Sequence, residues 1–235
     1  MTDAFHAGIY CTGNAALKSV SHNNIISRSM ISNYYAIYAY DYSFWDKIDG
    51  NHIRILNSPS LACGISLYNA QDTTYTAGQP AYIVNNEIIL TLAASADARG
   101  INIITPNGNW EIHHNSIFVE GLSTTNGIYI ENGNSGCKVN ISRNTVLCQG
   151  SGTPYPLYLG NYYSDLYGSR EFNNLYSPLY VAYAGSNIST IENLQKVSNT
   201  DGNTQNIKPI YKDNYSNLRL SSYNGLFVNM DPSYS

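Results

Sequence analysis

The stretch NGIYIENGNSGCKVNISRNTVLCQ, residues 126–149, nearly repeats an earlier stretch, RGINIITPNGNWEIHHNSIFVE, residues 99–120. Both open with glycine and alternating apolar residues. Both close on an apolar residue, two variable residues, an asparagine, one variable residue and a second apolar residue. Self-similarity at a fixed spacing is typical of repeat architectures, in which each unit is one layer of a stack.

The closing asparagine recurs along most of the chain. Its positions are Asn23, Asn51, Asn86, Asn115, Asn144 and Asn173, at spacings of 28, 35, 29, 29 and 29 residues. The opening unit, of which GIYI at 127–130 is an example, recurs in step with it. The last opening unit is PLYV at 178–181, which is expected to place Leu179 inward and Tyr180 outward. Two columns that keep step predict stacked structural repeats.

Each repeat contains three short segments with period-two alternation and β-branched residues, separated by Gly, Asn, Ser and Pro. Such segments favour strands and turns. We therefore expect an all-β chain, a right-handed parallel β-helix of about seven coils with strands ~4.8 Å apart. The asparagines are expected to form a ladder at a corner, where asparagine tolerates left-handed backbone.

A leucine-rich repeat is the alternative fold, because VNISRNTV at 139–146 also fits the pattern of that repeat. Leucine-rich repeats pair one strand with a helix or a leucine-rich return. Here the other half of each unit is a second Gly-Ile strand, which favours the β-helix.

Residues 8 to about 194 resemble the right-handed parallel β-helix proteins of bacterial secretion and cell-surface systems, a fold shared with pectate lyases and other polysaccharide-degrading enzymes. The C-terminal part of the chain resembles the closing segment of large secreted bacterial β-helix proteins. The residues that carry this resemblance are Ile207, Pro209 and Tyr211, followed by residues 217–220. Asn217 and Arg219 depart from that pattern at positions expected to face the surface. The resemblance implies coils over residues 1–184 and a C-terminal cap over residues 185–235.

The chain carries few charges. Its 235 residues include 12 Lys and Arg and 16 Asp and Glu, for a net charge of −4. A nucleic-acid partner is excluded on this ground, because phosphate binding needs clustered basic residues. No apolar run is long enough for a membrane helix, so membrane insertion is not expected. The four cysteines form no CxxC pair, and we expect free thiols and no metal site.

Tyrosine is the compositional outlier, at 22 residues. The outward positions of the first strand of each coil carry Tyr10, Tyr38, Tyr40, Tyr68, Tyr129, Tyr158 and Tyr180. Tyrosine combines an apolar ring with a hydrogen-bonding hydroxyl, which suits contact with sugars. Three interpretations stay open: a plain sheet surface, a platform for glycans, or an interface covered by another domain or copy.

The resemblance implies that an enzyme of this fold would need paired carboxylates, or acidic calcium ligands together with a basic residue. The first-sheet positions of this chain carry no such set. The catalytic candidates are Asp97, Arg99, Glu120 and Glu131, which could converge at the edge of adjacent coils. No cofactor is expected, and Ca²⁺ is implied only if the chain is an enzyme.

We therefore expect a non-catalytic extracellular or cell-surface module of a larger bacterial protein, such as a spacer or adhesin. Its partners would be a polysaccharide or cell-surface glycan and the rest of a longer parent chain. The alternative is a polysaccharide lyase or glycoside hydrolase of the same fold.

Overall fold

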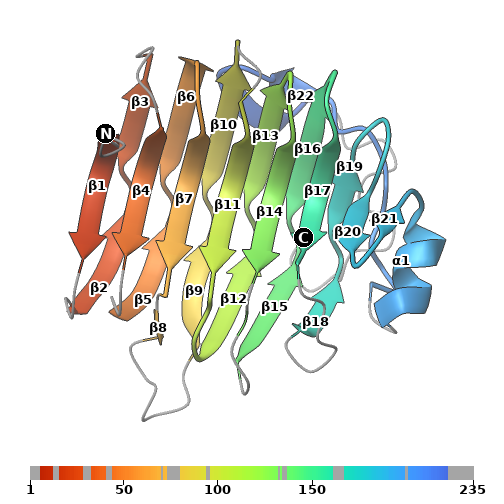
Figure 1. Ribbon diagram of the computed structural model, residues 1–235, viewed down its shortest axis with the longest axis horizontal. Helices are drawn as coiled ribbons and strands as arrows, with labels where there is room; N and C mark the ends of the chain where they lie inside the picture. The colour runs from red at the N-terminus through yellow and green to blue at the C-terminus, as the bar shows by residue number, and fades with distance from the viewer. Residues whose placement is uncertain are drawn as a thin grey trace.

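A computed structural model describes residues 6–12, 16–28, 33–40, 44–69, 71–72, 80–93, 96–131, 133, 137–160, 167–198 and 201–221. The chain winds into a right-handed parallel β-solenoid, in which successive turns add one strand to each of three sheets (Figure 1). The predicted all-β parallel β-helix is confirmed. The N-terminal strands lie at one end of the stack, and α1 (Ile191–Ser198) lies at the other.

The strands of the three sheets follow one another in the order first, second, third. The first sheet contains β1 (His6–Thr12), β4 (Tyr34–Tyr40), β7 (Ala62–Tyr68), β11 (Ala98–Ile104), β14 (Thr125–Glu131), β17 (Pro154–Leu159), β20 (Ala182–Ala184) and β21 (Asn187–Ile188). The second contains β2 (Ala16–Ser21), β5 (Phe44–Asp49), β9 (Ala81–Val84), β12 (Asn109–His113), β15 (Lys138–Ser142) and β18 (Tyr167–Glu171), with β8 (Gln71–Asp72) beside β5. The third contains β3 (Asn24–Ser27), β6 (His52–Ser58), β10 (Glu87–Leu92), β13 (Ser116–Gly121), β16 (Thr145–Gly150) and β19 (Asn174–Tyr176).

The asparagines lie one above another at the corner between the second and third sheets. Asn51 donates to Oδ1 of Asn86 twice, from Nδ2 at 2.9 Å and from its backbone N–H at 3.0 Å. The second Nδ2 proton reaches the carbonyl oxygen of Val20, in the preceding coil, at 2.9 Å. Asn86 and Asn115 repeat this arrangement. The predicted ladder is confirmed, and its buried amides are satisfied by it.

The left-handed backbone of each corner belongs to the residue before the asparagine. The sequence-based assignment of that conformation to the asparagine itself is wrong. Positive φ angles between 56° and 63° occur at His22, Gly50, Asn85, His114, Arg143 and Phe172. The asparagine side chain must point along the corner to reach its neighbours, so the reversal falls on the preceding, solvent-facing residue. Left-handed backbone costs a non-glycine residue ~1–2 kcal/mol, a cost that the ladder offsets.

Stacked aliphatic rows fill the interior. They are Ile37, Ile65, Ile101, Ile128 and Leu157 from the first sheet, Ile48, Ile83, Ile112 and Ile141 from the second, and Ile53, Ile88, Ile117, Val146 and Leu175 from the third. At Gly100, one of the opening glycines, close packing leaves no room for a side chain. A Cβ on Gly100 would lie 2.6 Å from the carbonyl oxygen of Gly127 and 2.6 Å from Cγ2 of Ile117.

The last coil is incomplete, so the solenoid has fewer complete turns than the seven predicted. After β20 the chain forms the antiparallel strand β21 and then α1, rather than another second-sheet strand. Leu179 was expected to face inward and is instead 48% exposed, because Ala182 pairs with Leu157. The hydroxyl of Ser177 accepts the N–H groups of Leu179 and Tyr180 at 3.1 and 3.0 Å. Because of this local turn, β20 begins only at Ala182.

Residues 201–207 occupy the C-terminal end of the stack. Arg170 takes the inward position that Ile141 has one coil earlier, and its Nε lies 3.3 Å from Oδ2 of Asp201. Both side chains are essentially inaccessible to solvent. The backbone N–H of Gln205 donates to the carbonyl oxygen of Asn173 at 2.7 Å. This segment therefore takes the place of a further coil.

A C-terminal hairpin then returns along the outside of the solenoid. Strands β22 (Tyr211–Asp213) and β23 (Asn217–Leu220) lie over the outer face of the third sheet (Figure 1). The buried cluster beneath them comprises Ile89, Phe118, Leu147, Tyr211 and Leu218. Arg219 is exposed, as predicted. Residues 222–235 of the predicted cap lie outside the described residues.

Candidate functional site

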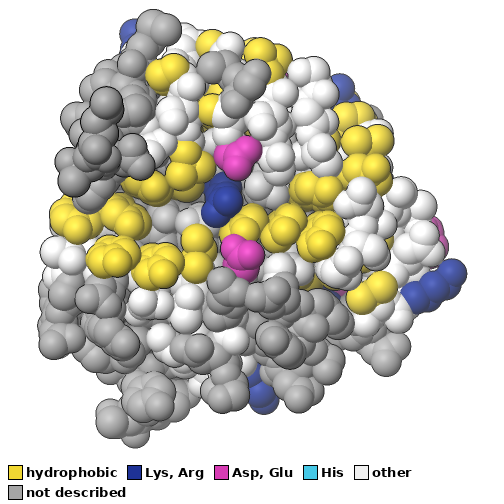
Figure 2. All heavy atoms as spheres, viewed as in Figure 1, with side chains coloured by type: hydrophobic (Ala, Val, Ile, Leu, Met, Phe, Trp, Pro, Cys, Tyr) yellow, Lys and Arg dark blue, Asp and Glu magenta, His cyan; other side chains and the backbone are white. Residues whose placement is uncertain are grey.

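Tyrosines dominate the outer face of the first sheet. Its central outward row, in register from coil to coil, is Tyr10, Tyr38, Ser66, Asn102, Tyr129, Tyr158 and Tyr183. Figure 2 shows hydrophobic side chains across this face on both sides of a few charged side chains. We name two groups: the N-terminal stack of Tyr10, Tyr35, Tyr38, Tyr40 and Tyr68, and the C-terminal stack of Tyr129, Tyr155, Tyr158, Tyr180 and Tyr183.

The N-terminal stack is the more open of the two. The ring of Tyr38 stacks on Tyr10, with centroids 5.5 Å apart, and on Tyr35, with centroids 4.5 Å apart. Tyr40 and Tyr68 form a parallel pair at 5.2 Å. Tyr10 is 47% exposed and Tyr40 is 41% exposed. This stack therefore offers ring surface and hydroxyl groups to solvent.

The C-terminal stack is more closed. The ring of Tyr158 lies between Tyr129, at 4.5 Å, and Tyr183, at 4.6 Å, with all three rings nearly parallel. Tyr155 meets Tyr158 edge-on and stacks on Tyr180 at 5.6 Å. Tyr129 and Tyr155 are only 7% and 8% exposed. Their rings mainly contact one another, so this stack stabilises the sheet surface.

A polar bridge separates the stacks. Asn102 donates from Nδ2 to the hydroxyl of Ser66 at 2.8 Å, and its Oδ1 accepts from Arg99 at 2.9 Å. The Arg99 guanidinium lies 3.9 Å from the ring centroid of Tyr129, a cation–π contact. The Tyr129 hydroxyl donates to the Glu131 carboxylate. The side chains of the bridge therefore contact one another and Tyr129.

Burial raises the pKa of three half-buried or buried tyrosines of the two stacks, Tyr35, Tyr38 and Tyr129. Burial raises the pKa of Tyr35 to about 12. For Tyr38, burial and then the neighbouring Tyr35, Tyr10 and Tyr40 hydroxyls raise the pKa. For Tyr129, burial and the hydrogen bond to Glu131 raise it. At neutral pH these hydroxyls are hydrogen-bond donors and acceptors, never anions.

The structure places most of the predicted tyrosines as expected, with one exception. Tyr180 precedes β20, and Tyr183 is the residue in register with Tyr158, so the predicted position of Tyr180 in the row is wrong. Tyr180 still joins the C-terminal stack through Tyr155. The sequence contained a signal for Tyr183, because VAYA at 181–184 resembles AIYA at 36–39. Tyr35 and Tyr155 were also missed, because each lies directly before the opening residue of its repeat, outside the positions that were counted from that residue.

The four catalytic candidates do not converge. Glu120 lies on β13 in the third sheet, where Gln149 donates to its carboxylate at 2.9 Å. Asp97 precedes β11, and Glu131 ends β14, about seven residues further along the strand direction. At ~3.3 Å per residue this is ~23 Å, whereas glycosidase carboxylates lie ~5–10 Å apart. Arg99 and Glu131 are linked only through Tyr129.

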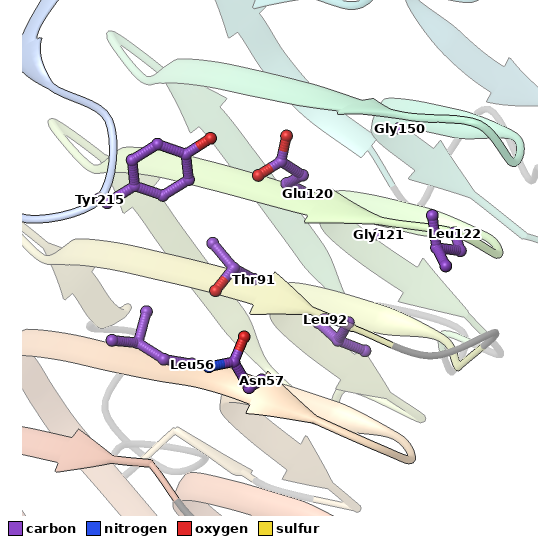
Figure 3. Close-up of a pocket in the computed structure, with 9 residues that line it drawn as sticks. All are labelled: Leu56, Asn57, Thr91, Leu92, Glu120, Gly121, Leu122, Gly150 and Tyr215. Carbon is purple, nitrogen blue, oxygen red and sulfur yellow. The ribbon is translucent and has the colours of Figure 1, made fainter.

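A hollow of about 430 Å³ lies beside the C-terminal hairpin, on the outer face of the third sheet (Figure 3). It is lined by Leu56, Asn57, Thr91, Leu92, Glu120, Gly121, Leu122, Gly150 and Tyr215. In Figure 3 the Tyr215 hydroxyl points toward the Glu120 carboxylate. That carboxylate is already held by Gln149. The hollow offers one acidic group and an apolar wall, and no second catalytic group.

The four cysteines form no disulfide, as expected, and all four are buried. Within the described residues, no three His, Cys, Asp or Glu side chains are grouped to hold a metal ion. The one helix of the described chain, α1, has 8 residues, and no described helix is long and apolar enough to cross a bilayer.

Comparison with protein families, curated proteins and solved structures finds no match to this chain.

Proposed function

We propose that this chain is a non-catalytic, extracellular module of a larger bacterial surface or secreted protein, and that its N-terminal stack binds glycans. The observation that carries the proposal is the solvent exposure of Tyr10 and Tyr40 on a rigid sheet face. An aromatic ring that carries a hydroxyl group can contact the apolar face of a sugar and hydrogen-bond its hydroxyl groups at the same time.

The repeating geometry of the face supports an extended ligand. Tyr10, Tyr38, Tyr40 and Tyr68 lie on three adjacent strands, each ~4.8 Å from the next. The inner rings stack face to face, so a ligand would contact ring edges, hydroxyl groups and the outermost ring faces. A polymer with regularly spaced hydroxyl groups fits such a row better than a single small molecule. The low charge of the chain, −4 over 235 residues, favours an uncharged ligand.

The enzyme alternative receives less support. Retaining and inverting glycosidases need two carboxyl groups on either side of one bond. Asp97 and Glu131 are too far apart for this role, and Glu120 lies on another sheet. Cleavage of a bound glycan is therefore the outcome that would favour a lyase or hydrolase.

A glycan array followed by titration of the hits tests the proposal. The double variant Tyr10→Ala/Tyr40→Ala should weaken binding at least about tenfold, which corresponds to ~1.4 kcal/mol. The matched control is Tyr215→Ala, which removes a 49% exposed tyrosine from the opposite side of the molecule. It should leave binding unchanged.

Two results would contradict the proposal. One is the absence of any glycan bound more tightly by the wild type than by the double variant. The other is release of shorter products from a bound glycan, measured by chromatography, which would identify an enzyme.

A further inference from the structure

The asparagine ladder has a direction, and its first member is incomplete. In the ladder, each Oδ1 accepts from the asparagine one coil earlier, as Asn51 Oδ1 accepts from Asn23 Nδ2 at 2.9 Å and from Asn23 N–H at 3.0 Å. No described residue donates to Oδ1 of Asn23. This acceptor faces the N-terminal end of the stack.

In the described part of the chain, the second Nδ2 proton of Asn23 also lacks the partner that the other ladder residues have. Every later ladder residue sends this proton to a carbonyl oxygen of the preceding coil, at 2.9–3.0 Å; the acceptors are Val20, Ile48, Ile83, Ile112 and Ile141. With this proton Asn23 makes, among the described residues, only the contact within its own coil, to Ser21 at 3.2 Å, which Asn115 and Asn144 make in addition to the bond to the preceding coil. Asn23 thus has one acceptor and one donor suited to a coil that would precede it.

The rest of this end agrees with the ladder. β1, β2 and β3 are the terminal strands of their sheets, and no strand of the described part of the chain pairs with their outer edges. The core residues Ile9 and Ile25 are half-buried, whereas Ile37 and Ile53, their equivalents one coil later, are fully buried. An open edge of three parallel strands above a partly exposed apolar core is a surface built to be covered.

The C-terminal end differs in this respect. There Gln205 binds the backbone of Asn173, and Leu175 N–H donates to the Gln205 carbonyl oxygen at 2.9 Å. Asp201 pairs with the inward Arg170. The chain closes this end with its own residues, which prevents a second copy from stacking head to tail.

We infer that the N-terminal end docks one further parallel coil, with a corner asparagine that donates to Asn23 Oδ1. The coil would be of the kind found within this chain and would be supplied by the larger protein of which we propose the chain to be a module. This inference rests on the proposed function only in treating the chain as a module of a larger protein. A second copy fits poorly, because two N-terminal ends would meet as antiparallel strands, with an Asn23 acceptor on each side and no ladder donor.

A fusion protein tests the inference. A copy of residues 98–124, one complete coil, is placed directly before His6 in place of residues 1–5. The register is conserved, because Ala98 stands one coil before Thr125 as the copied residue would stand before His6. Hydrogen exchange measured by mass spectrometry should show the amides of β1 and β3 exchanging at least tenfold more slowly than in the unfused protein.

The matched control is the same fusion with Asn115→Ala in the copied coil only. Protection of the corner around Asn23 should then fall by several fold. A second fusion, with residues 125–153 as the added coil, guards against misfolding of the first. Unchanged exchange in both fusions, or equal protection with and without the copied asparagine, would overturn the inference.

Two further outcomes are informative. A concentration-dependent dimer of the unfused protein that protects β1 and β3 would overturn the inference in favour of a second copy. Glycan binding is measured separately, so its loss or absence would affect the proposed function without affecting this result.

Discussion

The outer faces of the third and first sheets belong to the same coils, yet they carry different side chains. On the third sheet the outward row is Ile89, Phe118 and Leu147, in register on adjacent strands. The C-terminal hairpin covers this row with Tyr211 and Leu218, and all five side chains are buried. On the first sheet the outward row is mainly tyrosine, and Tyr10 stays 47% exposed.

The difference shows that side-chain type distinguishes a solenoid face that the chain itself covers from a face that stays open to solvent. Aliphatic and Phe side chains gain most from permanent burial, and they would be a liability if left exposed. Tyrosine stacks bury ring area against each other and keep the hydroxyl groups available for water or a polar ligand. The covered face thus contributes stability, whereas the tyrosine face combines stability with a surface suited to binding.

The largest expected effect comes from breaking the covered face. Phe118→Ala removes a fully buried ring that contacts the hairpin, where Tyr215 meets it edge-on at 5.7 Å. Truncation of a buried Phe costs ~3–5 kcal/mol. Urea denaturation should show a loss of about 3 kcal/mol, and hydrogen exchange should show the β22–β23 hairpin losing protection first.

The control for this prediction is Leu122→Ala, a change at a 51% exposed residue that lines the hollow beside the same hairpin. It should change the free energy of unfolding by less than about 0.5 kcal/mol. A loss below about 1 kcal/mol in Phe118→Ala would mean that the hairpin does not depend on this row.

The tyrosine face should respond less. Tyr158→Ala removes the middle ring of the C-terminal stack and its contacts at 4.5 Å with Tyr129 and 4.6 Å with Tyr183. Aromatic pairs contribute ~0.5–1.5 kcal/mol beyond area burial, so the expected loss in urea denaturation is about 2 kcal/mol. Tyr158→Phe keeps the stack and should cost less than about 0.5 kcal/mol. Equal losses in the two variants would assign the stability to the hydroxyl rather than to ring stacking.

The regular part of the fold could be predicted because each coil repeats the same local solution. Asn86 and Asn115 mark their corners by spacing alone, and Ile65 and Ile101 mark the core row. The corner conformation was misplaced by one residue. Sequence spacing locates a corner, but the hydrogen bonds that orient the asparagine decide which residue reverses the chain.

The irregular parts could not be predicted, because they depend on partners far apart in sequence. Arg170 occupies a core position only because Asp201, 31 residues later, is buried beside it. The PLYV unit at 178–181 imitates an opening strand, and the hydroxyl of Ser177 holds it in a turn instead. Glu120 and Glu131 were expected to converge, but they lie on different sheets. Glu120 is on β13 in the third sheet, and Glu131 is on β14 in the first sheet.

The smallest expected effect concerns a single hydroxyl of the tyrosine face. Burial raises the pKa of Tyr35 to about 12 from the usual ~10 of an unfolded chain. Between these values the unfolded chain loses a proton that the folded protein keeps, so stability falls as pH rises. The contribution is complete below pH ~10 and is lost as pH rises through about 12. Urea denaturation should therefore show wild type losing stability slightly faster than Tyr35→Phe between pH 10 and 12, by an amount that solvent screening keeps small. At pH 8 neither protein titrates at this position, which supplies the reference difference between them. Parallel stability curves across the alkaline range would contradict the raised pKa and leave ring stacking as the contribution of Tyr35 to the N-terminal stack.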